Sequence, residues 1–600
     1  MENVTKSWKS AIAAGGLALG LMTPVSVAVA DSDSLVASRA KQAAVTIGAA
    51  WFMLATVARA ADDPSDPRTK ARAARLQYTA GGSTLTTARN VGVGTLRDKA
   101  LPTTTGGDEK SGGAVTPNAP TAPSGLVTTS GSSSNTGPIS EASARSAHNV
   151  AIADFPHSSE NEPTVAANPR NPNNLVSGMH FYGDRGVRCA AHYSRDGGKT
   201  WNLKPIVMPQ LTHRSSCSDS VLAYAPDGSR VYFLYMDIKF ASFDIVVSYS
   251  DDDGKTWTGP ITVLTAGSAA DFDKPWINTH VAVGKGEGDD DGSRQKNSNW
   301  VYVTATRFEN VAPYDCSIQF TRSSNKGATW STSTTLDTSV AGCGNPVVVQ
   351  GSRPAGGLNR DVLGTWYHSG ADGFLEGTFN IRSRYSPDNG ATFQAIVVSP
   401  ETMFELPFWL GPFAQYHRWW GGMFPAIAIS QSGSAHIAYS ADPTANPFAS
   451  STDAEDGEIR YITSAGPPYA SWSTPTTVND DNSGRAQGWA TVGAATQDGQ
   501  PVVYVMWEDH RTAALDNESY DVFYSKKVGT GSWSANVKLT DAQSPSDFIF
   551  LGDYYHITVI KTGRDDPFVY GVWTDRRFEP TIFDYNDDIW GARISRTDDN

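Results

Sequence analysis

The eight residues SRDGGKTW at 194–201 recur three more times along the chain. The further copies are SDDDGKTW at 250–257, SSNKGATW at 323–330 and SPDNGATF at 386–393. In such a turn an Asp side chain can accept hydrogen bonds from backbone N–H groups, Gly permits a positive φ, and Trp can pack between neighbouring units. We therefore expect these turns to be structural, each joining two strands. The equivalent third positions are Asp196, Asp252, Asn325 and Asp388.

The turns belong to a longer repeat. Each follows a strand-like stretch, such as RCAAHYS before the first and DIVVSYS before the second. Weaker copies of strand and turn occupy 457–472, 520–533 and 588–600, which gives seven units of roughly 65 residues. Each unit also carries two further strands before this strand-like stretch and one strand after the turn. Four antiparallel strands repeated in this way predict a β-propeller.

The last unit ends after its third strand. The segment HNVAIADF at 148–155 precedes the first unit and alternates like a strand. We expect it to supply the missing strand and close the ring, because closure removes the exposed sheet edges.

The four turns match the Asp-box, or BNR-repeat, pattern, so residues 150–600 resemble the sialidase superfamily. The resemblance implies an all-β propeller of four-stranded blades. Seven blades follow from the repeat count, with six, the usual sialidase number, as the alternative. It also implies an exported glycan-active enzyme, a sialidase-like glycoside hydrolase of the exo-α-sialidase type. A non-catalytic carbohydrate- or protein-binding propeller and a polysaccharide lyase remain open alternatives.

The resemblance also suggests site residues. Sialidases use three Arg on the substrate carboxylate, a Tyr nucleophile activated by a Glu, and an Asp acid/base. The Arg-Ile-Pro motif of the family is absent, and the corresponding stretch reads SSENEPTVAANP. By resemblance, the catalytic residues would be Tyr554 beside Asp553 as nucleophile, with Asp273 or Asp237 as acid/base. The substrate-binding residues would be Arg418, Arg511 and Arg576 as an anion clamp, with His417 and Trp419.

In a propeller, the start of strand one, the end of strand two and the start of strand three share one face, opposite the box turns. Many acidic, basic and aromatic residues occupy these positions, among them Glu162, His180, Asp219, Lys274, Glu508 and Asp509. In WEDHR at 507–511 and WTDRR at 573–577, the Asp and Arg could instead brace each other.

Four cysteines allow three disulfide pairings, and the repeat favours one of them. Cys189 and Cys316 lie shortly before a box turn, whereas Cys217 and Cys343 lie just before the first strand of the next unit. The sequence therefore predicts the pairs Cys189–Cys217 and Cys316–Cys343, each linking one blade to the next. A metal site is the disfavoured alternative, because no His spacing supports it.

The N-terminal part has a different composition. Residues 1–60 read as a signal-peptide region, with a second signal at 35–60 that suggests a misassigned start, and 61–147 as a Ser/Thr/Gly/Pro-rich linker or propeptide. The propeller occupies 148–600. We expect a secreted or periplasmic monomer without a stable membrane anchor.

The charge limits the partners. The net charge is −14 and no basic stripe is present, which argues against nucleic acid and leaves an extracellular glycan or glycoprotein. We expect no cofactor and no metal. The stretch GEGDDDGS at 286–293 is a weak calcium candidate, since it lacks a bidentate Glu at loop spacing, and a solvated loop is favoured.

Overall fold

The computed structural model describes residues 149–594 of the chain, with gaps. The gaps are 155–157, 184–185, 213–214, 240–241, 283–296, 340–341, 344–346, 372–376, 401, 407–418, 443–456, 514–518, 547–550, 563–565 and 578–586. The predicted signal region, the predicted linker and the acidic stretch at 286–293 therefore lie outside the described residues.

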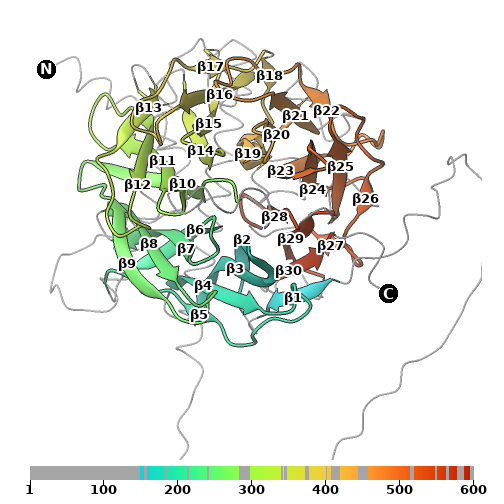
Figure 1. The fold of residues 1–600 in the computed structure, drawn as a ribbon, viewed down its shortest axis with the longest axis horizontal. Helices are drawn as coiled ribbons and strands as arrows, with labels where there is room; N and C mark the ends of the chain where they lie inside the picture. Colours follow the sequence, from blue (N-terminus) through green and yellow to red (C-terminus); the bar gives the residue numbers. More distant parts are fainter. Residues whose placement is uncertain are drawn as a thin grey trace, which may run out of the picture.

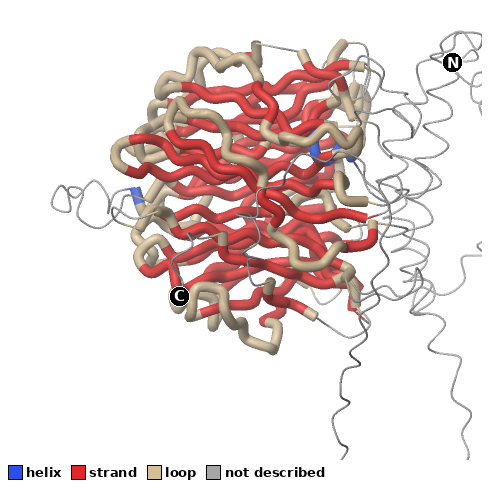
Figure 2. The backbone as a smooth tube through the Cα atoms, turned by 90° about the vertical axis from the view of Figure 1, so that its right-hand side faces the viewer, coloured by secondary structure: helices blue, strands red, loops and turns tan. Residues whose placement is uncertain are grey.

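The described strands form seven antiparallel sheets around a common centre (Figure 1). In blades 1 to 6 the first strand in sequence lies nearest the centre and later strands follow toward the rim. From the side, the strands run between two faces made of loops (Figure 2). The fold is thus the predicted seven-bladed propeller, and the six-bladed alternative is wrong.

The strands vary in length, and the rim strands are the shortest. Blades 1 and 2 comprise β2 (Glu160–Asn168), β3 (Asn171–Gly183), β4 (Gly186–Ser194) and β5 (Ile206–Val207), then β6 (Ser216–Tyr224), β7 (Val231–Lys239), β8 (Ser242–Ser250) and β9 (Thr258–Leu264). Blades 3 and 4 comprise β10 (Ala270–Thr279), β11 (Val301–Glu309), β12 (Cys316–Ser323) and β13 (Thr334–Thr338), then β14 (Val349–Gly356), β15 (Val362–Ser369), β16 (Thr378–Ser386), β17 (Val397–Val398) and the added β18 (Met403–Phe404).

The last three blades follow the same order. Blades 5 and 6 comprise β19 (Ala426–Ile429), β20 (Ala435–Ala441), β21 (Glu458–Ser464) and β22 (Thr476–Thr477), then β23 (Gln487–Gln497), β24 (Gln500–Asp509), β25 (Ser519–Val528), β26 (Val537–Lys538) and the added β27 (Ser544–Pro545). Blade 7 comprises β28 (His556–Ile560), β29 (Phe568–Asp575), β30 (Asp588–Arg593) and β1 (Val150–Ala153). A short 3-10 helix, η2 (Trp419–Met423), precedes β19.

The N-terminal strand closes the ring, as predicted. Strand β1 pairs antiparallel with β30, with Val150 opposite Gly591 and Ala151 opposite Trp590. It takes the rim position of blade 7, which the C-terminal part leaves vacant. The first and last segments of the propeller thus share one sheet.

The four box turns are built alike. In the second, the Asp252 carboxylate accepts hydrogen bonds from the Thr256 N–H at 2.8 Å, the Thr256 hydroxyl at 2.7 Å and the Ser250 hydroxyl at 2.7 Å. In the third, Asn325 keeps this pattern: its Oδ1 accepts from the Thr329 N–H, while its Nδ2 donates to the Thr329 hydroxyl. The first turn also reaches the neighbouring blade, since the Trp201 Nε1–H donates to the Tyr570 hydroxyl at 3.3 Å.

The box turns and the first hairpin turns lie on the same face of the ring. The Asp253 carboxylate of the second box accepts hydrogen bonds from Asn168 and Asn174, which flank the β2–β3 turn. We name this the bottom face, and the opposite one, where the first strand of each blade begins, the top face.

Removing a box carboxylate is expected to destabilise the ring modestly. Asp252→Ala loses an acceptor for three local hydrogen bonds, and the loss should cost about 1–2 kcal/mol of unfolding free energy, as for a lost helix cap. Asn325→Asp serves as the matched control and should change stability by less than about 0.5 kcal/mol, because Asp occupies the same position in the other three boxes. Urea denaturation would measure both, and a neutral Asp252→Ala would show that the turn does not need its carboxylate.

Both predicted disulfides are confirmed. Cys189 of blade 1 is bonded to Cys217 of blade 2, and Cys316 of blade 3 to Cys343, which precedes blade 4. Their Cα–Cα distances are 5.6 Å and 5.0 Å. Each bond joins neighbouring blades near the top face, and such bonds are typical of proteins folded outside the reducing cytoplasm.

Candidate active site

The first strands of blades 1, 2 and 3 each bulge near the top face. Their pairing shifts register between Asn161 and Thr164, between Ser218 and Val221, and between Asp273 and Trp276. The first residues inside the three bulges are Glu162, Asp219 and Lys274, with φ of 54°, 52° and 48°. The first strands of blades 4 and 6 bulge at the same point, with positive φ at Gly351 and Trp489, so the bulge belongs to the blade repeat, and it re-aims the side chain that it carries.

The re-aimed side chains meet at the centre of the ring. The Lys274 ammonium lies 2.5 Å from the Asp553 carboxylate, 3.4 Å from that of Asp219 and 3.5 Å from that of Glu162. Blades 3 and 7 are not neighbours in the ring, so the contact between Lys274 and Asp553 crosses the centre. All four side chains are buried. We call this group the ion cluster.

Asp273 borders the ion cluster and is its partly exposed neighbour. Its Oδ1 accepts a hydrogen bond from the Lys274 backbone N–H at 2.9 Å, and its Oδ2 accepts one from the Gln350 side-chain amide at 2.6 Å. The two donors come from different blades and fix the plane of the carboxyl group. Asp273 is thereby held in one orientation.

The surroundings separate the pKa values of Asp273 and Asp219. Burial raises the pKa of the Asp273 carboxyl to about 6, because the opposing Lys274 ammonium offsets only part of the desolvation. The carboxylates of Asp219 and Asp553 add to the rise. Burial alone would also raise the pKa of Asp219, but the Lys274 ammonium and the Ser218 hydroxyl outweigh this effect and lower the pKa to about 2. Two acids whose pKa values are driven apart suit general acid and ionised partner roles.

Tyr554 lies against the ion cluster. Its hydroxyl donates to the Ser220 carbonyl at 3.4 Å, and its ring packs edge-on to Trp276, with 5.4 Å between centroids. Burial raises its pKa well above the usual range, and the carboxylates of Glu162 and Asp219 add to the rise. The phenol therefore stays protonated at neutral pH, so attack by its oxygen would need a base to remove the proton during the reaction.

Aromatic and basic side chains fill the centre beneath the ion cluster. The Arg353 guanidinium lies 3.7 Å from the centroid of the Trp276 ring, and the His556 ring lies 5.7 Å from that ring. Burial lowers the pKa of His556 to about 3, so this histidine is neutral. These residues come from blades 3, 4 and 7, so their contacts cross the ring centre.

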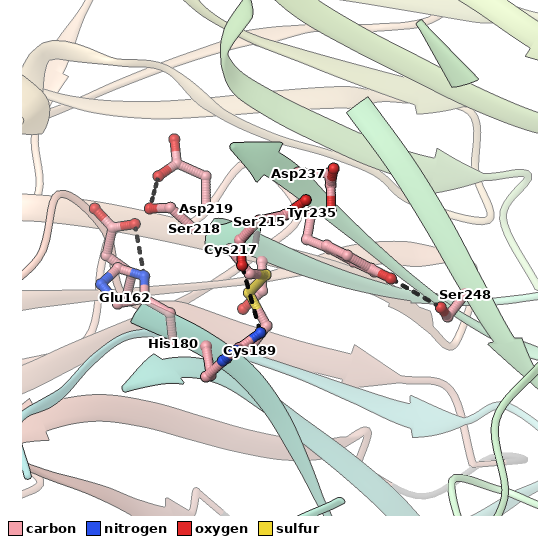
Figure 3. The surroundings of a disulfide bond; sticks show 12 residues. Glu162, His180, Cys189, Ser215, Cys217, Ser218, Asp219, Tyr235, Asp237 and Ser248 are labelled. Carbon is pink, nitrogen blue, oxygen red and sulfur yellow. Dashed lines mark hydrogen bonds and ion pairs between the residues drawn. A yellow bond between two sulfur atoms is a disulfide. The ribbon is translucent and has the colours of Figure 1, made fainter. Parts of the chain in front are cut away.

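Asp237, the second acid/base candidate, lies apart from the ion cluster. Its Oδ1 accepts a hydrogen bond from the Leu211 N–H at 3.2 Å, and burial raises its pKa. Figure 3 shows Glu162, paired with His180, and Asp219 on one side of the Cys189–Cys217 disulfide and Asp237 on the other. Asp237 holds the segment that precedes β6 and is not brought together with Asp273.

The predicted anion clamp is only partly described. The Arg511 guanidinium contacts the Asp509 carboxylate at 2.8 Å and the Asp480 carboxylate at 2.9 Å, and Arg576 lies 3.1 Å from Asp587. The bracing alternative thus fits WEDHR, and Arg577 pairs with Asp575 in the same way at 2.7 Å. His417 and Arg418 lie outside the described residues, and Trp419 is the first residue of η2. The clamp stays a prediction.

Some of these residues were predicted from the sequence. Asp273, Asp553 and Tyr554 were predicted as catalytic, and Glu162, Asp219 and Lys274 were placed on the correct face without a role. Gln350 was missed. The usable signal was the alignment of NEPT, SDSV and DKPW at 161–164, 218–221 and 273–276, which places a charged residue at the same point of three first strands.

Sequence comparison identifies no relative: no protein-family model and no curated protein matches this chain. Among solved structures, the ring is similar to the Hadza microbial sialidase Hz136, at 12% identity and a TM-score of 0.38 over 68% of this chain and 73% of that one. It is also similar to the α-L-arabinofuranosidase Arb93A from Fusarium graminearum, at 14% identity and 0.39 over 61% and 93%, and to a PL25 ulvan lyase, at 9% and 0.39 over 73% and 95%. Likeness at this level gives no basis for choosing an activity.

Among the described residues, no helix is long and apolar enough to cross a membrane. Within the same residues, no group of three or more His, Cys, Asp or Glu is arranged to hold a metal ion.

Proposed function

We propose that this chain is an exported glycan-active enzyme that hydrolyses glycosidic bonds at the centre of its top face. The observation that carries the proposal is the pair Asp273 and Asp219, one carboxyl group with a raised pKa and one with a lowered pKa, on neighbouring first strands. Glycoside hydrolysis needs this combination of an acid and an ionised carboxylate. The two disulfides and the predicted signal region support export.

The roles follow from the charges. Asp273, protonated and partly exposed, donates its proton to the glycosidic oxygen as the bond to the anomeric carbon breaks. Asp219 stays ionised because Lys274 stabilises its charge, and it faces the positive charge that develops on the sugar ring. It then either removes a proton from the attacking water or bonds to the anomeric carbon before water releases the sugar. Lys274 holds the surrounding carboxylates in place.

Three other functions remain as outcomes of the tests. Exo-α-sialidase activity, with Tyr554 beside Asp553 as nucleophile, is the finer prediction that the resemblance supplies. A binding propeller would retain glycans without turnover, and a lyase would release an unsaturated sugar instead of a hydrolysed one.

The pH dependence of hydrolysis tests the assignment. The general acid must be protonated, so kcat/KM should fall as pH rises through about 6, the pKa of Asp273. The partner must be ionised, so activity should also fall as pH drops toward about 2. We expect a bell-shaped profile with its maximum at roughly pH 4, measured on a panel of chromogenic glycosides. Activity that rises between pH 6 and 8 would contradict Asp273 as the acid.

A further inference from the structure

The charges around Lys274 bear on the class of sugar that fits, and this step rests on the proposed hydrolase function. Four carboxylates, those of Glu162, Asp219, Asp273 and Asp553, surround one ammonium group. With Asp273 protonated, the group still carries three carboxylates against the Lys274 ammonium, and the His180 ring beside Glu162, at 3.5 Å, can carry at most one further positive charge. A second carboxylate, brought in by a sialic or uronic acid, would bind against this excess of negative charge.

Four described cations near the top face are already paired with acids. Arg511 contacts Asp509, and Arg576 contacts Asp587. Lys239 lies 2.5 Å from Asp244, and Arg307 lies 2.6 Å from Glu309. To bind a sugar carboxylate, any of these cations would have to give up an existing partner.

Arg353 differs from these cations because it is not paired with a described acid. It has no carboxylate partner among the described residues and stacks on Trp276 beneath the ion cluster. Burial lowers the pKa of Arg353 to about 9, and among the described residues Tyr554 opposes this. The guanidinium lies against the Trp276 ring and forms no ion pair with a described carboxylate.

The site also has buried acceptors that lack donors. The Gln350 side chain is fully buried, and while its Nε2 donates to Asp273, its Oε1 accepts no hydrogen bond from the described residues. Asp219 Oδ2 likewise lacks a well-aligned donor among the described residues, although it lies 3.4 Å from the Lys274 ammonium and Asp219 also interacts with the Glu162 carboxyl group. Buried acceptors without donors cost free energy, and sugar hydroxyl groups are donors that would satisfy them.

We infer that this site takes an uncharged glycoside, whose hydroxyl groups donate to Asp219 and Gln350, and discriminates against sialosides and uronides. The inference departs from the substrate that the resemblance to sialidases implies. It names a substrate class and leaves the acid and its ionised partner as proposed.

Matched substrates test the inference directly. 4-Nitrophenyl β-D-glucoside and β-D-glucuronide differ only in the carboxylate at C6, as do the galactoside and galacturonide, and an arabinofuranoside and a sialoside extend the set. We expect kcat/KM to be at least about 100-fold higher for the neutral members. Hydrolysis confined to the sialoside or the uronides would overturn the inference and leave the hydrolase function standing.

Binding provides a second readout that needs no turnover. The Asp273→Asn protein, checked for folding by circular dichroism, would be applied to a glycan array that carries each chain with and without a terminal acidic sugar. Retention of neutral termini is expected, and preference for the acidic ones would overturn the inference. If no glycoside is hydrolysed by the unchanged protein, the hydrolase function fails, and the array still decides the charge class.

Discussion

Replacing Asp273 by Asn is expected to lower kcat about 10²- to 10⁴-fold, the usual contribution of a general acid. The amide keeps the size of the carboxyl group and can still accept the Lys274 N–H, while Gln350 can turn its amide to offer an oxygen. What is lost is the proton. The loss should therefore be largest for glycosides with a poor leaving group and much smaller for 2,4-dinitrophenyl glycosides, whose leaving group needs no protonation.

Asp237→Asn is the matched control for this variant. Asp237, like Asp273, is an acid near the top face with a raised pKa, but it is fully buried beside the disulfide and away from the ion cluster. Its variant should keep kcat within a few-fold of the unchanged protein. Equal losses of kcat in both variants would contradict the acid role, as would a loss in Asp273→Asn that does not depend on the leaving group. A complete loss in Tyr554→Phe with only a small loss in Asp273→Asn would favour the sialidase-type mechanism.

The fold was readable from the sequence because the box turns mark four of the seven blades at the same point and weaker copies mark the other three. SRDGGKTW and its copies fix where strand three ends, and the spacing between copies leaves room for four strands. Ring closure followed from one missing strand and one unassigned strand, and the disulfides followed from the equivalent positions of Cys189 and Cys316. Each inference used local pattern or repeat symmetry, both of which a single sequence contains.

The site was only partly readable because its contacts cross the ring. Lys274 and Asp553 are 279 positions apart and come from blades that are not neighbours. Nothing local distinguishes Asp273, which faces Gln350, from Asp237, which holds a neighbouring loop. The bulges decide which side chains turn inward. A positive φ at Glu162 or Asp219 is a property of the backbone that cannot be predicted from composition. The paired state of Arg511 likewise depends on the separate segment that carries Asp480.

Replacing Lys274 by Met is expected to destabilise the protein by about 3–5 kcal/mol at pH 7, the usual cost of leaving buried charges without their partner. The ammonium is buried among Glu162, Asp219 and Asp553, and these carboxylates raise the pKa of Lys274 against the effect of burial. Met fills the same volume without charge. Lys526→Met is the control, because Lys526 and Asp566 form a half-exposed pair at 3.4 Å and should contribute less than about 1 kcal/mol.

The pH dependence of the stability lost in Lys274→Met identifies the cause of the loss. Without the ammonium, the pKa values of the buried carboxylates rise above their unfolded values of about 4. Such groups destabilise the folded state fully above their folded pKa and not at all below their unfolded pKa. The difference in unfolding free energy between Lys274→Met and the unchanged protein should therefore narrow as the pH falls from 7 toward 4. Urea denaturation at each pH would measure it. A gap that stays constant over this range would mean that Lys274 stabilises the ring by packing alone, and that the carboxylates are not held ionised by its charge.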